Sequence, residues 1–234
     1  MIDLPLDKLK PGQVTAQSIY NSSGGSFLTR GTKLTPQYID KLQHLGIDNL
    51  HVMSTRADEK MAPPEDILSE KTRVLAVKRV YDVFQQVEKS GTLDPEPLAQ
   101  VADTMVNDIV ERHGNLVQLT DIRAHDMYTF AHCVNVAMLS TLIGVLAGLT
   151  PKQLGELSLG ALMHDVGKIS IPLNILNKPG RLTDEEFAVI KSHPQAGYDK
   201  ITSMRRLDAA KLGLVALQHH EHMDGRGYPA GLKG

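Results

Sequence analysis

The sequence has very little cysteine and few aromatic residues. Of its 234 residues only Cys133 is a cysteine, none is tryptophan, and aromatic residues make up 4%. A single cysteine excludes an internal disulfide framework and any zinc site built from several thiolates. Neither sign of charge predominates, because the sequence has 25 basic and 27 acidic residues. This balance argues against a protein that binds nucleic acid over a broad basic surface, although a local basic pocket is compatible with it.

Long hydrophobic runs are scarce as well. One uncharged and mostly apolar stretch covers residues 133–151, but it contains Asn135, Ser140 and Thr141 and follows a histidine. We therefore interpret it as a buried core helix rather than a membrane span. The N-terminus has no basic segment followed by an apolar one, so no signal peptide is predicted and we expect a cytoplasmic location in a bacterial cell.

The first 55 residues indicate a small α+β domain. Strand-like segments at residues 14–20 and 26–30 flank a turn rich in serine and glycine, which predicts a β-hairpin. Thr35 and Gly46 are typical start and stop signals of a short helix, and residues 47–52 are typical of a closing strand. Charged residues and two adjacent prolines at residues 56–66 predict a linker.

The rest of the chain is predicted to be mainly α-helical. Apolar residues recur at spacings of three and four along two stretches within residues 67–116, which we expect to form two connecting helices. Asp94 and Pro95 are typical of the start of the second helix. Residues 117–234 are expected to form a helical domain. The apolar stripes are Val74, Val77, Tyr81 and Phe84 in the first helix and Leu98, Val101, Met105 and Ile109 in the second.

Ten histidines are present, and those after residue 120 fall at informative positions. Thr150 and Gln153 form a capping-box pattern, which predicts a helix that carries His164 and Asp165 and ends at Gly167. We expect His164 and Asp165 to point into the packed interior. A buried imidazole beside a buried carboxylate is costly without partners, so the pair is either a hydrogen-bonded core pair or part of a metal site.

Further histidines favour the metal site. Thr183 and Glu186 form a second capping-box pattern, which predicts a helix that carries His193, and His219 and His220 lie at a predicted helix end. Nitrogen and oxygen ligands without thiolate suit iron, manganese, nickel or zinc in a catalytic site. These ligands are too many for one tetrahedral ion. Two metals about 3.5–4 Å apart, bridged by Asp165, would use all of them. Such a pair would generate hydroxide from water and bind a phosphoryl group. The predicted ligands, from four helices, are His132, His164, Asp165, His193, His219 and His220.

Three basic residues near these ligands are candidates for substrate binding. Lys168 lies one turn beyond His164 and could meet a phosphate oxygen as a compact charge, the alternative being a solvated lysine at a helix end. Lys178 and Arg181 lie in the loop that follows and could attract a dianionic substrate.

The order of these residues resembles the HD-GYP family. The resemblance is carried by the segment His164-Asp165-Val166-Gly167-Lys168, then by His193-Pro194, and then by His219-His220-Glu221. The segment Asp224-Gly225-Arg226-Gly227-Tyr228-Pro229 completes the signature, and the helix around His132 matches the family's opening helix. The series spans about residues 120–234. The first 55 residues resemble a small domain often attached to this family.

The resemblance implies an HD-superfamily helical bundle that hydrolyses cyclic di-GMP to pGpG and GMP. It implies that the six residues above are ligands, with Asp165 bridging, and that Lys168 contacts phosphate. Relatives with a third metal use a glutamate where this chain has Tyr128, so two divalent metal ions are expected, with iron or manganese favoured over nickel or zinc. Family members continue beyond the position of Gly234, so we expect the domain to be incomplete at its C-terminus. The loop expected beside the site contains Asp224, Gly225, Gly227, Tyr228 and Pro229.

Three functions stay open from the sequence. The first is a cyclic di-GMP phosphodiesterase, and the second is the same chemistry on another cyclic dinucleotide or phosphoester. The third is a non-catalytic module that binds a nucleotide or docks a protein. A signalling protein or a second copy of the chain is a candidate partner, and Tyr228 either supports the site or faces such a partner.

Overall fold

The computed structural model describes residues 2–16, 18–20, 26–44, 47, 49–53, 66–115 and 128–234. Several sequence predictions lie outside the described residues. They are the turn at 21–25, the helix stop at Gly46 and the linker up to residue 65.

The N-terminal unit combines two small antiparallel sheets with one helix. Strand β1 (Ile2–Pro5) pairs with β4 (Asn49–Val52), so that Ile2 faces Val52, and β2 (Ile19–Tyr20) pairs with β3 (Ser26–Leu28). A short 3₁₀ helix, η1 (Leu6–Lys8), follows β1, and helix α1 (Pro36–His44) lies between β3 and β4. The predicted hairpin, helix and closing strand are confirmed, although the hairpin strands are shorter than expected. Strand β1 was not predicted, because Asp3 and Pro5 interrupt its apolar pattern.

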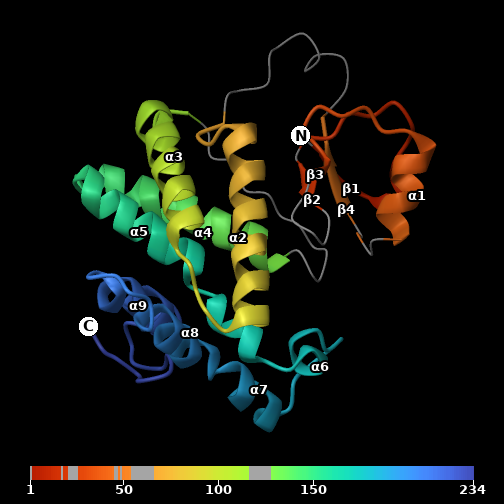
Figure 1. Ribbon diagram of the computed structural model, residues 1–234. Helices are drawn as coiled ribbons and strands as arrows, with labels where there is room; N and C mark the ends of the chain where they lie inside the picture. The colour runs from red at the N-terminus through yellow and green to blue at the C-terminus, as the bar shows by residue number, and fades with distance from the viewer. Residues whose placement is uncertain are drawn as a thin grey trace.

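Two long antiparallel helices open the helical unit. Helix α2 (Glu70–Ser90) begins at Ser69, whose side chain accepts a hydrogen bond from the Thr72 amide, and ends at Gly91 with a positive φ of 71°. Helix α3 (Glu96–Arg112) packs beside it (Figure 1). Both stripes predicted from the sequence lie largely in the core, as expected from their spacing.

The middle of the chain forms two helices that cross behind α2 and α3 (Figure 1). Helix α4 (Tyr128–Leu146) packs against α2, α3 and α5 (Pro151–Met163), and the capping box of Thr150 and Gln153 at the start of α5 is confirmed. Cys133 and Met138 on α4 are fully buried, so the interpretation as a core helix holds there. The far end of α4 is exposed at Ile143 and Leu146. None of the described helices has the length and apolar character needed to cross a membrane.

Two predicted helix boundaries were wrong. The helix that begins after Thr150 ends at Met163 and not at Gly167, because the chain tightens into the 3₁₀ helix η2 (Val166–Ser170). His193 does not belong to the helix opened by Thr183. That helix, α7 (Asp184–Ile190), ends earlier, and His193 is the first residue of α8 (His193–Thr202). Proline suits the first turn of a helix because an N–H at that position would have no partner, and Pro194 therefore favours a helix start at this point.

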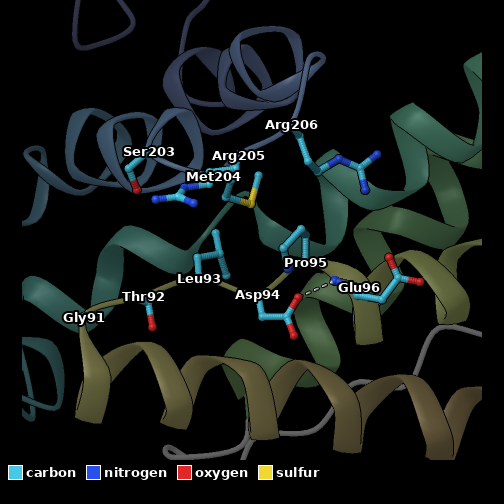
Figure 2. Close-up of a pocket in the computed structure, with 10 residues that line it drawn as sticks. All are labelled: Gly91, Thr92, Leu93, Asp94, Pro95, Glu96, Ser203, Met204, Arg205 and Arg206. Atoms are coloured by element: carbon cyan, nitrogen blue, oxygen red, sulfur yellow. Dashed lines mark hydrogen bonds between the residues drawn. The ribbon is translucent and has the colours of Figure 1, made fainter.

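Short helices complete the chain. Helix α6 (Leu173–Leu176) and α7 follow η2, and α8 packs against both η2 and α9 (Ala209–Gln218). A cleft of about 510 Å³ lies between the α2–α3 turn and the α8–α9 turn, with Leu93 and Met204 in its lining (Figure 2). Because α8 starts at His193 and α9 leads to His219, this cleft lies at the opposite end of both helices from the histidines.

The two units share one continuous apolar cluster, which includes Leu6 of the first unit and Ala216 of the second. Ile67 and Leu68, just before α2, are fully buried in it. The Ser18 hydroxyl donates a hydrogen bond to the Glu70 carboxylate at the start of α2, which ties the hairpin to the helical unit. The division into a unit at residues 1–55, a linker, connecting helices at 67–116 and a domain at 117–234 stays a prediction.

Candidate metal centre

The predicted ligands come together from the ends of several helices. His132 lies on α4, His164 caps the end of α5, and Asp165 joins α5 to η2. His193 opens α8, and His219 caps α9 with His220 directly after it. The six side chains form two groups, and within each group the candidate ligand atoms lie within 4.8 Å of one another. One group is His132, His164 and Asp165, and the other is His193, His219 and His220.

The Asp165 carboxylate joins the two groups, because its oxygens face opposite ways. Oδ2 lies 3.2 Å from His164 Nε2 and 4.0 Å from His132 Nε2. Oδ1 lies 3.4 Å from His193 Nε2 and 3.6 Å from His219 Nε2. The predicted bridging position of Asp165 is therefore geometrically available: one carboxylate oxygen faces each group.

Three imidazoles are oriented by backbone carbonyls. Nδ1 of His164, His193 and His219 lies 2.7–2.8 Å from the carbonyl oxygen of the residue three positions earlier. A carbonyl can only accept a hydrogen bond, so Nδ1 carries a proton and Nε2 is the ring nitrogen that faces the centre, where it can bind a cation whenever the ring is neutral. This is the arrangement that fixes the tautomer of histidines that bind metal. The three acceptors are Ala161, Ile190 and Ala216.

Two observations test whether a cation fits here. Nε2 of His193 and Nε2 of His219 lie only 3.1 Å apart. Since both Nδ1 atoms carry protons, two lone pairs face each other unless a positive charge lies between them. In addition, Asp165 Oδ1 is buried without a hydrogen bond of normal geometry among the described residues. A buried carboxylate oxygen in that state is costly, so the donor set fits a divalent cation.

The charge state of the centre follows from its burial. Asp165 is 1% exposed, and burial by itself raises the pKa of its carboxyl, but the imidazoles of His164, His193 and His219 around it outweigh this and hold the pKa well below its usual range. Burial together with the neighbouring imidazoles of His219 and His193 lowers the pKa of His220 to about 4. At neutral pH the centre therefore contains a carboxylate and a neutral His220, both ready to bind a cation.

His164 is the exception among the imidazoles. Burial by itself lowers its pKa, but contacts with Cys133 and Asp165 outweigh burial and raise the pKa well above the ordinary value. In the metal-free protein His164 thus carries the positive charge that partly balances Asp165. Cys133 is fully buried beside it.

Of the predicted substrate-binding residues, Lys168 is the one with a contact to this centre. Lys168 Nζ lies 2.7 Å from Asp165 Oδ2, and its side chain is 22% exposed, so the ammonium borders both the centre and solvent. Lys178 Nζ forms an ion pair with Glu186 at 2.6 Å, an interaction that the sequence analysis did not anticipate. Arg181 is exposed in the same loop.

Close backbone contacts hold the elements around the centre. A Cβ atom on Gly167 would lie 2.0 Å from the His193 carbonyl oxygen, so only glycine allows η2 to approach the start of α8 this closely. Gly227, in the loop after His220, would likewise place a Cβ atom 2.5 Å from the His220 carbonyl oxygen. The glycines of both motifs therefore act by fixing the backbones that carry the ligands.

The loop after His220 lies against the centre, as predicted. The rings of Tyr228 and His220 stack, with centroids 4.6 Å apart and an angle of 20° between planes. The Asp224 carboxylate accepts hydrogen bonds from the Arg226 amide at 2.9 Å and from its Nε at 2.6 Å, which closes the turn through Gly225. Pro229 follows Tyr228 at the exposed surface. Glu221 binds the far end of this loop, a role that was not predicted. Its position directly after the histidine pair is the feature of the sequence that could have indicated this role.

The chain matches known proteins over this region. The family model described as HD domain matches residues 100–234. The chain is 33% identical over 153 residues to the cyclic di-GMP phosphodiesterase PA4108 of Pseudomonas aeruginosa, covering 65% of this chain and 37% of the relative. It is 30% identical over 178 residues to the 3'3'-cGAMP-specific phosphodiesterase 3 of Vibrio cholerae, covering 76% of this chain and 36% of the relative. The chain thus spans about a third of the length of these curated relatives.

A solved structure supports the fold. Bd1817, described as an HDG"Y"P protein from Bdellovibrio bacteriovorus, aligns with a TM-score of 0.56 and 21% identity, over 99% of this chain and 81% of that chain. The predicted mainly helical fold with a small strand-containing N-terminal region is confirmed. The matching family model covers more than half of the chain and includes every predicted ligand, and the histidine–aspartate pair at His164 and Asp165 lies at the centre of the site, so the chain belongs to the HD domain family.

Proposed function

We propose that this chain is a metal-dependent phosphodiesterase that opens cyclic di-GMP to pGpG and then GMP. The observation that carries this proposal is the convergence of four imidazoles on the two oxygens of Asp165, with His220 grouped with His193 and His219. The similarity to curated cyclic di-GMP phosphodiesterases supports the choice of substrate.

Two divalent ions suit the two ligand groups. A set of imidazoles and a carboxylate suits iron, manganese, nickel or zinc, and the resemblance to the HD-GYP family favours iron or manganese among them. When bound, such ions supply Lewis-acid polarisation of a phosphodiester and generate a nucleophile from water near neutral pH. The chain's own contribution is to direct Nε2 of His164, His193 and His219 inward by binding Nδ1 to backbone carbonyls. Asp165 serves both groups through its separate oxygens.

Lys168 is the residue best placed to meet the substrate. Its ammonium lies at the edge of the centre and is partly exposed, so it can donate to a phosphate oxygen while it stays near Asp165. Arg181 is exposed in the loop before α7 and could attract the dianion. Lys178 is held by Glu186, so we assign it to stabilising the loop between α6 and α7, with a contribution to the positive potential at most.

The test is a turnover assay on the full chain with cyclic di-GMP and either Mn²⁺ or, without oxygen, Fe²⁺. We expect pGpG as the first product, separated by chromatography, and no product after chelation. Absence of pGpG from protein with bound metal would refute this function. Binding of cyclic di-GMP without turnover would instead favour a non-catalytic nucleotide-binding module.

A second substrate has a specific observation in its favour. The chain also resembles two proteins of Vibrio cholerae named 3'3'-cGAMP-specific phosphodiesterases 2 and 3, at 33% and 30% identity. Both substrates present the same phosphodiester to the centre and differ only in one base. Side-by-side kcat/KM values for cyclic di-GMP and 3'3'-cGAMP decide between them, and a higher value for the hybrid dinucleotide would overturn our choice.

A further inference from the structure

Glu221 directly follows the histidine pair and binds the far end of the motif loop, which we define as residues 222–232. Its Oε1 accepts hydrogen bonds from the amides of Ala230 at 2.7 Å and Gly231 at 3.2 Å. Its Oε2 accepts a hydrogen bond from the amide of Leu232 at 2.9 Å. A carboxylate with three backbone donors is a strong local anchor, because each bond is assisted by its charge. Glu221, the residue next to the predicted ligands, therefore holds the far end of the motif loop in place.

The closed loop is held against His220 by its backbone. The Tyr228 amide donates a hydrogen bond to the His220 carbonyl oxygen at 3.1 Å. Gly227 fits only because it has no side chain, since a Cβ atom there would lie 2.4 Å from Glu221 Cα. These contacts place the Tyr228 ring on the His220 imidazole, and Phe187 of α7 packs edge-on against Tyr228 at 6.3 Å.

His220 depends on this stacking more than the other imidazoles do. His164, His193 and His219 each donate Nδ1–H to a carbonyl, whereas no residue in the described parts of the chain makes a hydrogen bond to the His220 ring. Its plane is set instead by neighbouring rings, with Tyr228 stacked at 4.6 Å and 20°. Removal of the tyrosine from this face would leave the ring free to rotate away from the second ligand group.

We propose that Glu221 is a positioning residue for the metal centre: by anchoring the motif loop through three amides it holds Tyr228 against His220 and orients that imidazole toward His193 and His219. The proposal rests on the proposed function, because it assigns His220 as a ligand. It also makes a claim about the metal-free chain that can be tested separately.

The first experiment uses the full chain without metal and follows the His220 ring protons and the amides of residues 230–232 by NMR. Stacking on Tyr228 shifts the ring protons upfield, so Glu221→Ala should move them downfield, as Tyr228→Ala does. Amide exchange at residues 230–232 should accelerate by about tenfold or more as the carboxylate is lost. Tyr228→Phe keeps the ring and should leave the His220 signals near their original positions. Glu111→Gln, which removes an exposed carboxylate from α3, should change none of these signals.

The second experiment titrates the same variants with Mn²⁺ by calorimetry. Loss of a residue that orients a ligand weakens metal binding by about 10- to 100-fold, so Glu221→Ala and Tyr228→Ala should show that loss while Tyr228→Phe and Glu111→Gln bind as the wild type does. Unmoved His220 signals and unchanged Mn²⁺ affinity in Glu221→Ala would overturn the positioning role. If the wild type bound no metal, the proposed function and the assignment of His220 as a ligand would both be refuted. The NMR signals of His220 would still show whether Glu221 orients the ring.

Discussion

At the scale of single residues, the Asp108 carboxylate on α3 fixes the start of α2. Its Oδ2 accepts a hydrogen bond from the Ser69 amide at 3.1 Å, and Arg112 lies 3.5 Å from Oδ1. Burial by itself raises the pKa of Asp108, but hydrogen bonds from Thr72 and Ser69, with the charge of Arg112, outweigh it and lower the pKa below 3.8. A carboxyl with a lowered folded pKa stabilises the protein above its unfolded pKa and loses this contribution as the pH falls through the folded pKa.

Asp108→Asn should therefore destabilise the protein at pH 7 by about 1–2 kcal/mol, and the deficit should shrink as the pH falls below 3.8. Urea unfolding of both proteins at pH 7, 5 and 3 measures it. Asp103→Asn removes an exposed carboxylate from the same helix and should have little effect at any pH. A deficit of equal size at pH 7 and pH 3 would show that the charge is not its source.

The residues of the metal centre were largely predictable, but the means by which they are held were not. His164 and Asp165 stood out because adjacent buried imidazole and carboxylate groups need partners. The carbonyl that accepts Nδ1–H from each of three histidines could not be predicted, since any backbone offers the same atom. The Lys178–Glu186 ion pair could not be predicted either, because the sequence assigns Glu186 only to the capping box. In the structure its carboxylate both caps the start of α7 and binds Lys178.

At the scale of elements, the contact between η2 and α8 determines the spacing of the centre. A methyl group on Gly167 would meet the His193 carbonyl at 2.0 Å, and backbone cannot give way as a flexible side chain can. Gly167→Ala should lower the free energy of unfolding by about 1–3 kcal/mol, the usual cost of overpacking, and weaken Mn²⁺ binding because His193 moves. Thermal unfolding and calorimetry measure both effects.

Gly114→Ala is the matched control for this substitution. No atom of the residues that the structure describes lies within 4 Å of a Cβ atom at Gly114, so the same added methyl group should be tolerated. Equal losses in both variants would show that the contact with α8 is not the source of the effect, because the replacement of a glycine at an open position restricts only the unfolded chain and does not by itself destabilise the protein.

Helix starts were predicted more reliably than helix ends. Capping boxes at Thr150 and Thr183 involve residues three apart in the sequence, so the pattern is local and visible. The change from α5 to η2 and the restart of the helix at His193 depend on the close approach of η2 to α8 across about 30 residues, which no local pattern contains.

At the scale of the whole molecule, the centre links segments that are far apart in the chain. His132 and His220 belong to α4 and to the residues after α9, while the intervening ligands come from the end of α5 and the start of α8. An unfolded chain cannot present these groups together. Any cation that they bind should therefore stabilise the folded state alone, by about 2.7 kcal/mol when its concentration is 100 times Kd.

We expect Mn²⁺ to raise the unfolding temperature of the full chain by about 5–10 °C under that condition, taking about 2–4 °C per kcal/mol for a chain of this size. Ca²⁺ prefers oxygen ligands and should give little shift, because the centre offers five imidazoles and one carboxylate. Asp165→Asn removes the group shared by both halves and should abolish the shift, whereas Asp199→Asn, an exposed change on α8, should preserve it. Differential scanning fluorimetry with and without chelator measures each case. A cation held at the junction of α5 and η2 must bind more weakly when the carboxylate that serves both ligand groups becomes a neutral amide. An equal Mn²⁺-induced shift of the unfolding temperature in Asp165→Asn would therefore show that the ion binds elsewhere.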